Sequence, residues 1–208
     1  MDKSDIGLYL VTDRKLFPDT AGLLAAIGSA LAGGLKAVQL REKDLATGEL
    51  LDLAYRMRDL TSQYGARLFI NDRLDIAISV GADGVHLGHE SMPVRAAKKV
   101  SEGRLAVAVS THSVLQAKQA EAEGADFITL GPVFDTASKR QYGRPVGTEV
   151  LKEAASTLSI PVLAIGGITP NRVAEVMSNG ASGIALISAI LTADDIQNTT
   201  EEFMRKLK

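Results

Sequence analysis

The sequence contains no cysteine and no tryptophan among its 208 residues, and it has only three histidines. Without cysteine, the chain can form neither disulfides nor thiolate metal sites, and it has no cysteine nucleophile. Three histidines also argue against a histidine-rich zinc site. No apolar run approaches the ~20 residues that span a bilayer, and residues 1–5 are too polar to begin a secretory signal. We therefore expect a cytoplasmic protein without a membrane segment.

A strong excess of either charge is also missing, because 23 Lys and Arg stand against 25 Asp and Glu. No basic tract interleaved with aromatic residues is present, which argues against a nucleic-acid partner. No linker or shift in composition divides the chain, so we predict one domain over residues 1–208. The sequence leaves open whether this domain forms a homo-oligomer.

Four segments share one pattern: a glycine, a short apolar run and a closing leucine. They are residues 34–40, 81–87, 124–130 and 180–186, spaced at about the length of two strand–helix units. Each glycine stands where a left-handed residue would end the preceding helix. This repeat predicts an α/β fold, a (βα)8 TIM barrel.

The remaining apolar runs complete the barrel. We predict strands near residues 7–12, 36–41, 67–71, 84–87, 105–110, 127–131, 161–166 and 183–187. The runs are almost continuously apolar, as is typical of parallel strands that are buried on both faces. Barrel enzymes place their active sites at the carboxyl ends of the strands, so the residues just beyond each run are the functional candidates. The polar connection 134–147 is a candidate active-site loop.

The second strand ends in Gln39, Arg41 and Lys43, which alternate and therefore point to one side. Burying Gln and Arg costs free energy unless each finds a partner. An anionic ligand at the barrel mouth would supply one, since Arg and Lys suit phosphate oxygens. The alternative is a solvated strand end that pairs internally with Glu42 or Asp44.

The third strand ends in Asn71 and Asp72. Amide and carboxylate oxygens suit Mg²⁺, which usually binds one or two protein carboxylates together with substrate phosphates. The alternative is that Asp72 and Asp75 form an acidic first turn of a helix. The residues alone leave the two interpretations equal.

Small and hydroxyl residues follow the last strands. Gly166 and Gly167 come after the seventh strand and Ser188 after the eighth, where barrels often bind phosphate through backbone N–H groups. A tight turn would also explain the glycine pair. Beyond the sixth strand, two hydroxyls and an ammonium would suit phosphate oxygens, although any solvated loop can contain them: Thr136, Ser138 and Lys139.

The three histidines follow or occupy strands. His112 comes just after Ser110 at the end of the fifth strand and could act as a general base, although capping or packing is the commoner role. We interpret His86, within the fourth strand, as a hydrogen-bonded core residue. His89 is expected at the rim of the active site.

Together these motifs resemble the thiamine phosphate synthase/TenI family over nearly the whole chain. The resemblance rests on five motifs in order: Gln-Leu-Arg-Glu-Lys at 39–43, Ile-Asn-Asp at 70–72, Gly-Val-His-Leu-Gly at 84–88, Gly-Pro-Val-Phe at 131–134 and Gly-Gly-Ile at 166–168. It implies a Mg²⁺-dependent transferase of thiamine biosynthesis. Such a synthase joins 4-amino-2-methyl-5-hydroxymethylpyrimidine diphosphate to a thiazole phosphate, giving thiamine phosphate and diphosphate.

The resemblance also implies roles for the candidate residues. The pyrimidine diphosphate would be held by Gln39, Arg41 and Lys43, with Asn71 and Asp72 on the Mg²⁺ side. The thiazole phosphate would be held by Thr136, Ser138, Gly167, Ile187 and Ser188. Ser110 and Lys139 would lie beside the reacting pyrimidine. Because the family reaction is dissociative, it requires no protein nucleophile.

The fourth strand end departs from the synthase pattern. Synthases typically read Gly-Gln-Glu-Asp there, and the Asp is a second Mg²⁺ ligand, whereas this chain reads Gly88-His89-Glu90-Ser91. Ser91 precedes Met92 and Pro93, a pattern typical of a helix N-cap, and serine is a poor magnesium ligand.

Three other functions remain open. TenI-like thiazole tautomerases keep the barrel and the thiazole phosphate pocket, need no Mg²⁺, and use a histidine that aligns with His112. Retention of all five residues for the diphosphate and Mg²⁺ favours the synthase, namely Gln39, Arg41, Lys43, Asn71 and Asp72. A non-catalytic binder of thiazole or thiamine phosphate, and another phosphate-binding barrel of amino-acid biosynthesis, rank lower.

Overall fold

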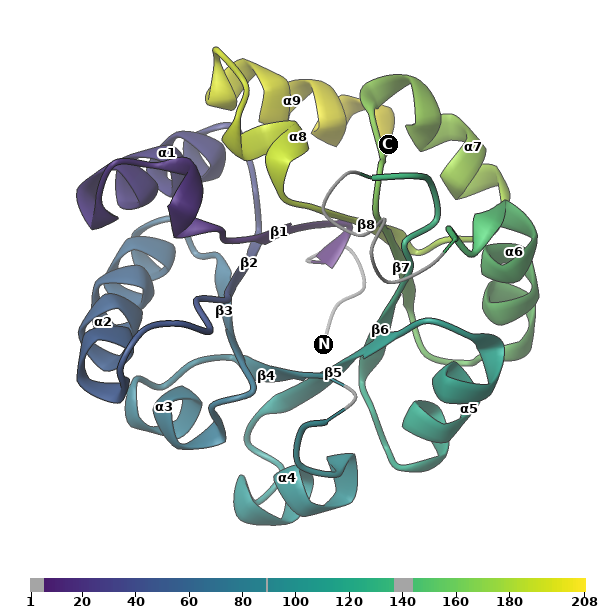
Figure 1. Ribbon diagram of the computed structural model, residues 1–208, viewed down its shortest axis with the longest axis horizontal. Helices are drawn as coiled ribbons and strands as arrows, with labels where there is room; N and C mark the ends of the chain where they lie inside the picture. The colour runs from purple at the N-terminus through teal and green to yellow at the C-terminus, as the bar shows by residue number, and fades with distance from the viewer. Residues whose placement is uncertain (1–5, 89, 137–143) are drawn as a thin grey trace.

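The computed structural model describes residues 6–88, 90–136 and 144–208. Eight parallel strands pair in sequence order, and β8 pairs with β1, so the sheet is a closed barrel (Figure 1). This confirms the predicted (βα)8 fold. The strands are β1 Leu8–Val11, β2 Ala37–Leu40, β3 Arg67–Asn71, β4 Gly84–Leu87, β5 Ala106–Thr111, β6 Phe127–Leu130, β7 Val162–Ile165 and β8 Gly183–Leu186.

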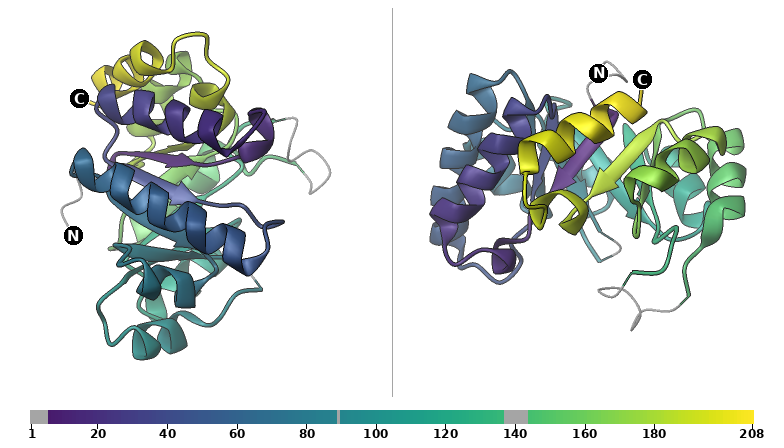
Figure 2. Two further views of the ribbon diagram at one scale, coloured as in Figure 1. Left: turned by 90° about the vertical axis from the view of Figure 1, so that its left-hand side faces the viewer. Right: turned by 90° about the horizontal axis from the view of Figure 1, so that it is seen from above.

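Helices cover the outside of the barrel (Figure 2). Their bounds are α1 Thr20–Ala32, α2 Thr47–Gln63, α3 Leu74–Ser79, α4 Val94–Val100, α5 Val114–Ala122, α6 Gly147–Thr157, α7 Val173–Ser178, α8 Ser188–Leu191 and α9 Ile196–Lys206. Within the described ranges, none of these helices has the length and apolar character needed to cross a membrane.

Local sequence explains where several helices begin and end. The side chains of Asp19, Ser113 and Asp195 accept hydrogen bonds from backbone N–H groups in the first turns of α1, α5 and α9. The repeated glycines all have positive φ after a helix, as the pattern predicts: 97° at Gly34, 62° at Gly81, 96° at Gly124 and 86° at Gly180.

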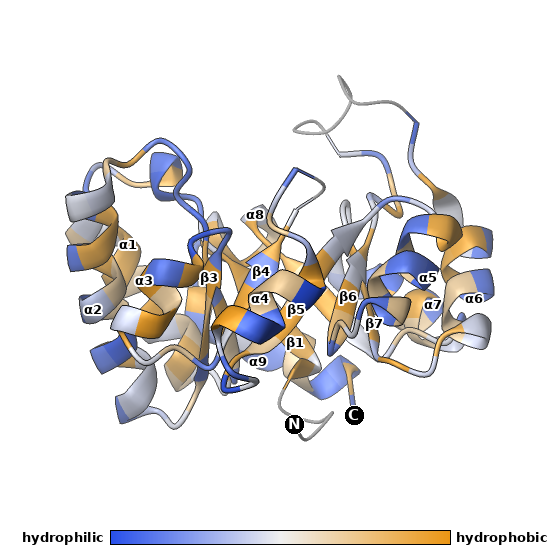
Figure 3. Cartoon of the chain, turned by 90° about the horizontal axis from the view of Figure 1, so that it is seen from below, coloured by the Kyte–Doolittle hydropathy of each residue, from blue (hydrophilic) through white to orange (hydrophobic). Residues whose placement is uncertain are grey.

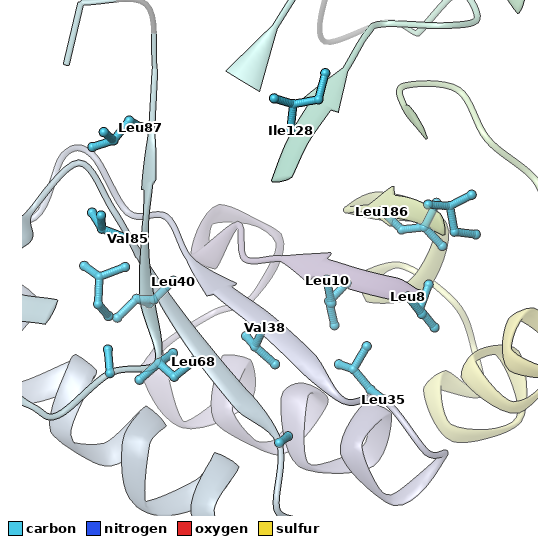
Figure 4. Packing of buried hydrophobic residues seen from close by; sticks show 14 of the residues in the cluster. Leu8, Leu10, Leu35, Val38, Leu40, Leu68, Val85, Leu87, Ile128 and Leu186 are labelled. Atoms are coloured by element: carbon cyan, nitrogen blue, oxygen red, sulfur yellow. The ribbon is translucent and has the colours of Figure 1, made fainter. Parts of the chain in front are cut away.

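Alternating residues of each strand fill two apolar layers. In β1, Leu8 and Leu10 pack outward against the helices, in the layer that Figure 4 shows, whereas Tyr9 and Val11 belong to the cluster inside the barrel. Both faces are therefore buried, which explains why the strands read as continuous apolar runs. Figure 3 shows the same division, with hydrophobic strands at the centre and hydrophilic residues on the outer faces of the helices.

Three aromatic rings fill the middle of the barrel. Tyr9, Phe69 and Phe127 meet edge to face, with ring centroids 5.4 to 5.6 Å apart. Such pairs contribute about 0.5–1.5 kcal/mol each beyond the burial of their surface. Gly84 has no Cβ, which would otherwise meet the ring of Phe69. The barrel interior is thus a packed core, and a ligand can be held only above it.

Candidate active site

The predicted site residues gather at one end of the barrel because all eight strands run in the same direction. The described part of the connection after β6 lies at this end, and the C-terminus lies at the other (Figure 3). Residues from β2 and β3 lie next to each other, as do those from β7 and β8, since these strands pair directly. Ser138, Lys139 and His89 lie outside the described residues.

A pocket of about 230 Å³ lies between the ends of β2 and β3 and the first turns of α2. Its wall combines apolar side chains with charged and amide groups, so it could take a polar ligand with a hydrophobic portion. The residues lining it are Leu40, Glu42, Lys43, Leu45, Leu50, Asn71, Asp72 and Arg73.

Two acidic side chains near this pocket are occupied by partners other than Arg41 and Lys43. Glu42 accepts hydrogen bonds from the Thr12 hydroxyl at 2.6 Å and from a backbone N–H after β1 at 3.0 Å. Asp44 pairs with the side chains of residues 14 and 15. The alternative of an internal ion pair to Glu42 or Asp44 is therefore wrong.

The two cations of β2 differ in what they contact. Lys43 lies 3.5 Å from a carboxylate oxygen of Asp72, across the gap between the strand ends. The Arg41 guanidinium has no hydrogen-bond or ion-pair partner among residues 6–88, 90–136 and 144–208. A half-buried guanidinium without a partner is suited to an anion supplied by a ligand.

Asp72 lies outside helix α3 and adopts an unusual backbone conformation. Its φ of 59° falls in the left-handed region, which Asp tolerates better than most residues. Helix α3 begins at Leu74, and Asp75 in its first turn pairs with Arg73 at 2.6 Å. The helix-turn alternative thus describes Asp75, whereas the backbone turns the Asp72 side chain toward the strand ends.

Both carboxylate oxygens of Asp72 accept from neighbouring donors. Oδ1 accepts from the Ser91 hydroxyl and from the Gly88 N–H at 3.3 Å, and Oδ2 accepts from the Asn71 amide at 2.9 Å. Burial alone would raise the pKa of Asp72, but the Ser91 hydrogen bond and the Lys43 charge lead the contacts that hold this pKa below its ordinary value. The carboxylate is therefore anionic at neutral pH.

The prediction that Ser91 caps a helix is wrong. Helix α4 begins at Val94 with Pro93 at its N-cap. The Ser91 hydroxyl instead contacts Asp72 and accepts from the Gly88 N–H at 2.6 Å. The Asp72 carboxylate lies at the end of a neighbouring strand. It offers the Ser91 hydroxyl a stronger hydrogen bond than a neutral partner would.

The oxygens of Asp72, Asn71 and Ser91 are of the hard type that Mg²⁺ prefers. No group of three His, Cys, Asp or Glu residues that could hold a metal occurs in the described part of the chain. Mg²⁺ does not need one, because it often binds a single carboxylate and takes its other ligands from water and substrate phosphates. Asp72 is a carboxylate with two neutral oxygen-bearing side chains in contact with it, Asn71 and Ser91.

A chain of polar side chains crosses the barrel above its aromatic core. The Gln39 amide donates to the Tyr9 hydroxyl at 3.3 Å, Tyr9 contacts His86 Nδ1 at 3.2 Å, and His86 Nε2 contacts Ser110 Oγ at 2.9 Å. Burial lowers the pKa of His86 to about 3 and raises the pKa of Tyr9. Both side chains are therefore neutral, and the interpretation of His86 as a hydrogen-bonded core residue is confirmed.

The connection after β6 is fixed to the glycine pair after β7. Two backbone bonds extend the pairing of these strands: the Val133 N–H donates to the Ile165 carbonyl at 2.8 Å, and the Phe134 N–H donates to the Gly166 carbonyl at 3.1 Å. Gly167 has a φ of 65°, and a Cβ there would lie 2.6 Å from the Asp135 carbonyl oxygen. Only glycine fits this turn, which exposes backbone close to the strand ends.

Arg172 strengthens this arrangement and was not among the residues predicted from the sequence. Its guanidinium lies 4.4 Å from the centre of the Phe134 ring and donates to the Gly167 carbonyl at 2.6 Å. Thr136 is half-buried farther along the same connection. Ile187 and Ser188 stand at the start of the short helix α8, directly after β8.

His112 lies where its sequence position predicted, after β5. Its Nδ1 hydrogen-bonds the Gly131 carbonyl, and its backbone N–H donates to Gln116 at 2.7 Å. Because Nδ1 must donate to a carbonyl, the Nε2 atom of a neutral His112 carries the free lone pair. The exposed ring is thus both anchored and able to accept a proton.

Sequence reasoning missed the Tyr9 hydroxyl as a site-related group. The available signal was a tyrosine at an inward position of an otherwise apolar strand, because a buried hydroxyl needs a polar partner. Its partners lie 30 and 77 residues away in the chain, so no local spacing identifies them.

Comparison with known proteins agrees with this geometry. The family model described as thiamine monophosphate synthase matches residues 8–190. A relative from Geobacter sulfurreducens is 52% identical over 199 residues, covering 94% of this chain and 91% of the relative. The thiamine-phosphate synthase of Pyrococcus abyssi is 40% identical over 205 residues, covering 99% and 96%.

Solved structures give the same result. The thiamine phosphate pyrophosphorylase from Pyrococcus furiosus matches with a TM-score of 0.90 at 38% identity, covering 99% of this chain and 96% of that one. A 3-hexulose-6-phosphate synthase, with a TM-score of 0.75 at 19% identity over 97% and 100% of the two chains, shares the fold alone. The chain therefore belongs to the thiamine monophosphate synthase family.

Proposed function

We propose that this protein is a thiamine-phosphate synthase, a transferase that couples 4-amino-2-methyl-5-hydroxymethylpyrimidine diphosphate with a thiazole phosphate. Family membership and the names of the relatives support the reaction. One observation in this chain carries it: the Arg41 guanidinium has no partner among the described residues and stands two residues before Lys43, which contacts Asp72 across two paired strand ends. This combination suits a diphosphate and its counterion.

The diphosphate would bind across β2 and β3. Arg41 offers a planar guanidinium for paired phosphate oxygens, and Lys43 offers a point charge. Lys43 contacts Asp72 in the structure. We propose that the diphosphate draws Lys43 toward its own oxygens, so that Asp72 becomes available to a metal ion.

Asp72 would hold Mg²⁺ with its carboxylate, and Asn71 and Ser91 would stand at the edge of the ion's ligand shell. When bound, Mg²⁺ neutralises charge on the leaving diphosphate. The left-handed conformation of Asp72 and its hydrogen bonds hold the carboxylate in place before the ion arrives. The low pKa of Asp72 keeps that carboxylate charged.

The thiazole phosphate would bind on the opposite side of the mouth. Backbone N–H groups of Gly167, Ile187 and Ser188 at the ends of β7 and β8 would contact its oxygens. Thr136 and Ser138 would add hydroxyl donors from the connection after β6. The contacts that join this connection to the Gly166 turn support a pocket built from both loops.

The reaction needs positioning and charge stabilisation more than a nucleophile. The C–O bond to diphosphate breaks, the electron pair leaves with the diphosphate, and the pyrimidine methylene becomes a resonance-stabilised cation. The thiazole nitrogen then donates its lone pair to form the C–N bond. Arg41 and Lys43 would stabilise the departing anion, with Ser110 and Lys139 beside the reacting pyrimidine.

A tautomerase activity is the second candidate, and His112 is the observation that favours it. Its ring is anchored through Nδ1 and presents Nε2 as a base at the barrel mouth. A tautomerase, however, has no use for the cationic and carboxylate residues of β2 and β3.

The two candidates separate when the carboxylated thiazole phosphate is given alone and its ring proton is followed by NMR. We expect no isomerisation above the rate without protein. Fast isomerisation that disappears in His112→Gln would instead favour the tautomerase.

A further inference from the structure

Two buried residues have no assigned part in the reaction, although they connect two that do. Tyr9 and His86 are 0% and 2% exposed, and both lie between Gln39 and Ser110 in the hydrogen-bonded chain across the barrel. The order of donors and acceptors along such a chain decides which groups its two ends can offer to a ligand.

The hydrogen bonds run from donor to acceptor in one direction, beginning at Gln39. The Gln39 amide nitrogen donates to the Tyr9 oxygen, so the Tyr9 proton is free to point at His86 Nδ1. A neutral histidine that accepts at Nδ1 carries its proton on Nε2. His86 therefore donates from Nε2 to Ser110 Oγ.

The neutral form of His86 follows from its surroundings. A buried imidazolium would need a paired carboxylate, and the ring nitrogens contact only hydroxyl groups of Tyr9 and Ser110. The ring also stacks on Tyr9, with centroids 5.7 Å apart, and lies edge to face with Phe127. These rings exclude water from the imidazole, and loss of hydration disfavours its charged form.

Ser110 receives a second hydrogen bond. The Thr129 hydroxyl approaches Ser110 Oγ at 3.5 Å from β6, so both lone pairs of Ser110 face donors. The Ser110 proton has no acceptor among the residues that the structure describes. Since Ser110 is half-buried at the end of β5, this proton is available to a ligand that displaces water there.

At the other end of this series of hydrogen bonds, Gln39 offers an acceptor instead of a donor. Gln39 Oε1 makes no hydrogen bond within the described ranges. It is nevertheless not a fully buried atom, because the only fully buried side-chain polar atom without a partner in these ranges is Arg14 Nε. The amide oxygen therefore retains contact with the space above the core. It can accept from a ligand donor.

We infer that Tyr9 and His86 are positioning residues, which fix Gln39 Oε1 as an acceptor and the Ser110 hydroxyl as a donor toward the pyrimidine substrate. This inference rests on the proposed function. With this polarity, Ser110 recognises an acceptor atom, a ring nitrogen or a phosphate oxygen. If these hydrogen bonds ran in the reverse direction, His86 would carry its proton on Nδ1. Ser110 would then be an acceptor toward the ligand, and the Gln39 amino group would point outward.

The test reads the His86 tautomer directly. Long-range ¹H–¹⁵N correlation spectra of the uniformly ¹⁵N-labelled protein at neutral pH show which ring nitrogen is protonated. His89→Gln and His112→Gln assign the signals of the three histidines. We expect the proton on Nε2 in the unmodified protein and a mixture of tautomers in Tyr9→Phe, which keeps the ring and removes the hydroxyl.

Kinetics of the same variant test the consequence. Tyr9→Phe should lower kcat about tenfold while changing KM for the thiazole phosphate less than twofold, because only the pyrimidine side is misaligned. Tyr55→Phe is the matched control, since its hydroxyl bonds a backbone carbonyl on the outer helices, and it should keep the unmodified kcat.

Several results would overturn the inference. They are a protonated Nδ1 or an imidazolium in the unmodified protein, an unchanged tautomer in Tyr9→Phe, or an unchanged kcat in Tyr9→Phe once the tautomers are mixed. The spectra require no turnover. If the unmodified protein shows the expected tautomer but forms no thiamine phosphate, the polarity stands and the proposed function fails.

Discussion

Arg41 is the residue on which the proposed function depends most. Its backbone N–H donates to the Thr12 hydroxyl at 2.9 Å, which fixes the strand end, while the guanidinium has no partner in the described part of the chain. The fold therefore positions the Arg41 guanidinium without a described contact that would stabilise the folded state. A side chain in this position contributes more to ligand binding than to stability.

Replacing this guanidinium should affect catalysis and leave the fold intact. Arg41→Ala should lower kcat by about 100-fold or more, as expected when a group that stabilises developing charge is removed. Its melting temperature should stay close to that of the unmodified protein. The matched control is Arg56→Ala on the exposed face of α2, which should keep normal kinetics. Normal kinetics in Arg41→Ala would contradict the diphosphate assignment.

Ser91 offers a second test at the level of one side chain, because its hydroxyl contacts the Asp72 carboxylate. Ser91→Asp would place two carboxylates side by side, which Mg²⁺ can bridge. We expect apparent Mg²⁺ affinity, measured by calorimetry in the presence of inorganic diphosphate, to rise about tenfold. Without metal, the like charges should lower the melting temperature.

Ser91→Asn separates charge from shape at this position. The asparagine has nearly the same size as aspartate but no charge, so it should not strengthen Mg²⁺ binding. Equal affinities in Ser91→Asp and Ser91→Asn would show that the Asp72 carboxylate is not where the ion binds.

At the level of elements, the turn after β7 and the connection after β6 form one unit. The Gly166 carbonyl, the Phe134 ring and the Arg172 guanidinium link the two segments. The proposed phosphate pocket at this end would depend on the backbone path of the turn, so its geometry could be disturbed without removing any functional side chain.

Gly167→Ala tests this unit. Both Gly167 and Gly65 have left-handed backbones, with φ of 65° and 58°, so alanine costs about 1–2 kcal/mol of stability at either position. Only at Gly167 would the new Cβ meet other backbone, since nothing lies within 4 Å at Gly65. KM for the thiazole phosphate should rise at least about tenfold in Gly167→Ala alone. Equal KM values in the two variants would remove Gly167 from the phosphate pocket.

The elements themselves were predictable because their signals are local. Continuous apolar runs mark strands that are buried on both faces, and glycines such as Gly34 and Gly124 end helices with the expected positive φ. The role of Ser91 was not predictable in this way. Its sequence neighbours favour a helix cap, but the competing partner, Asp72, comes from another strand end.

For the molecule as a whole, barrel closure brings together residues that the sequence keeps far apart. The parallel direction of the strands explains why the candidate residues at the ends of β2, β3, β5, β7 and β8 lie at one end of the barrel. It does not specify pairwise contacts, so the chain from Gln39 to Ser110 and the contact of Arg172 with Phe134 needed the structure.

The candidate residues at the carboxyl end of the barrel form two groups on different sides, and this arrangement is also a property of the whole molecule. Cationic and carboxylate groups follow β2 and β3, and the glycine turn and the start of α8 follow β7 and β8. The core of Tyr9, Phe69 and Phe127 closes the space beneath them. Under the proposed function, two phosphorylated substrates would approach each other above the core without sharing a binding group.

The most direct test is one reaction mixture that contains the protein, both substrates and Mg²⁺, with thiamine phosphate and diphosphate measured over time. We predict that the two products form in equal amounts, that formation stops when either substrate is omitted, and that it stops when Mg²⁺ is chelated. The absence of thiamine phosphate above background would contradict the central claim that this barrel couples the two substrates.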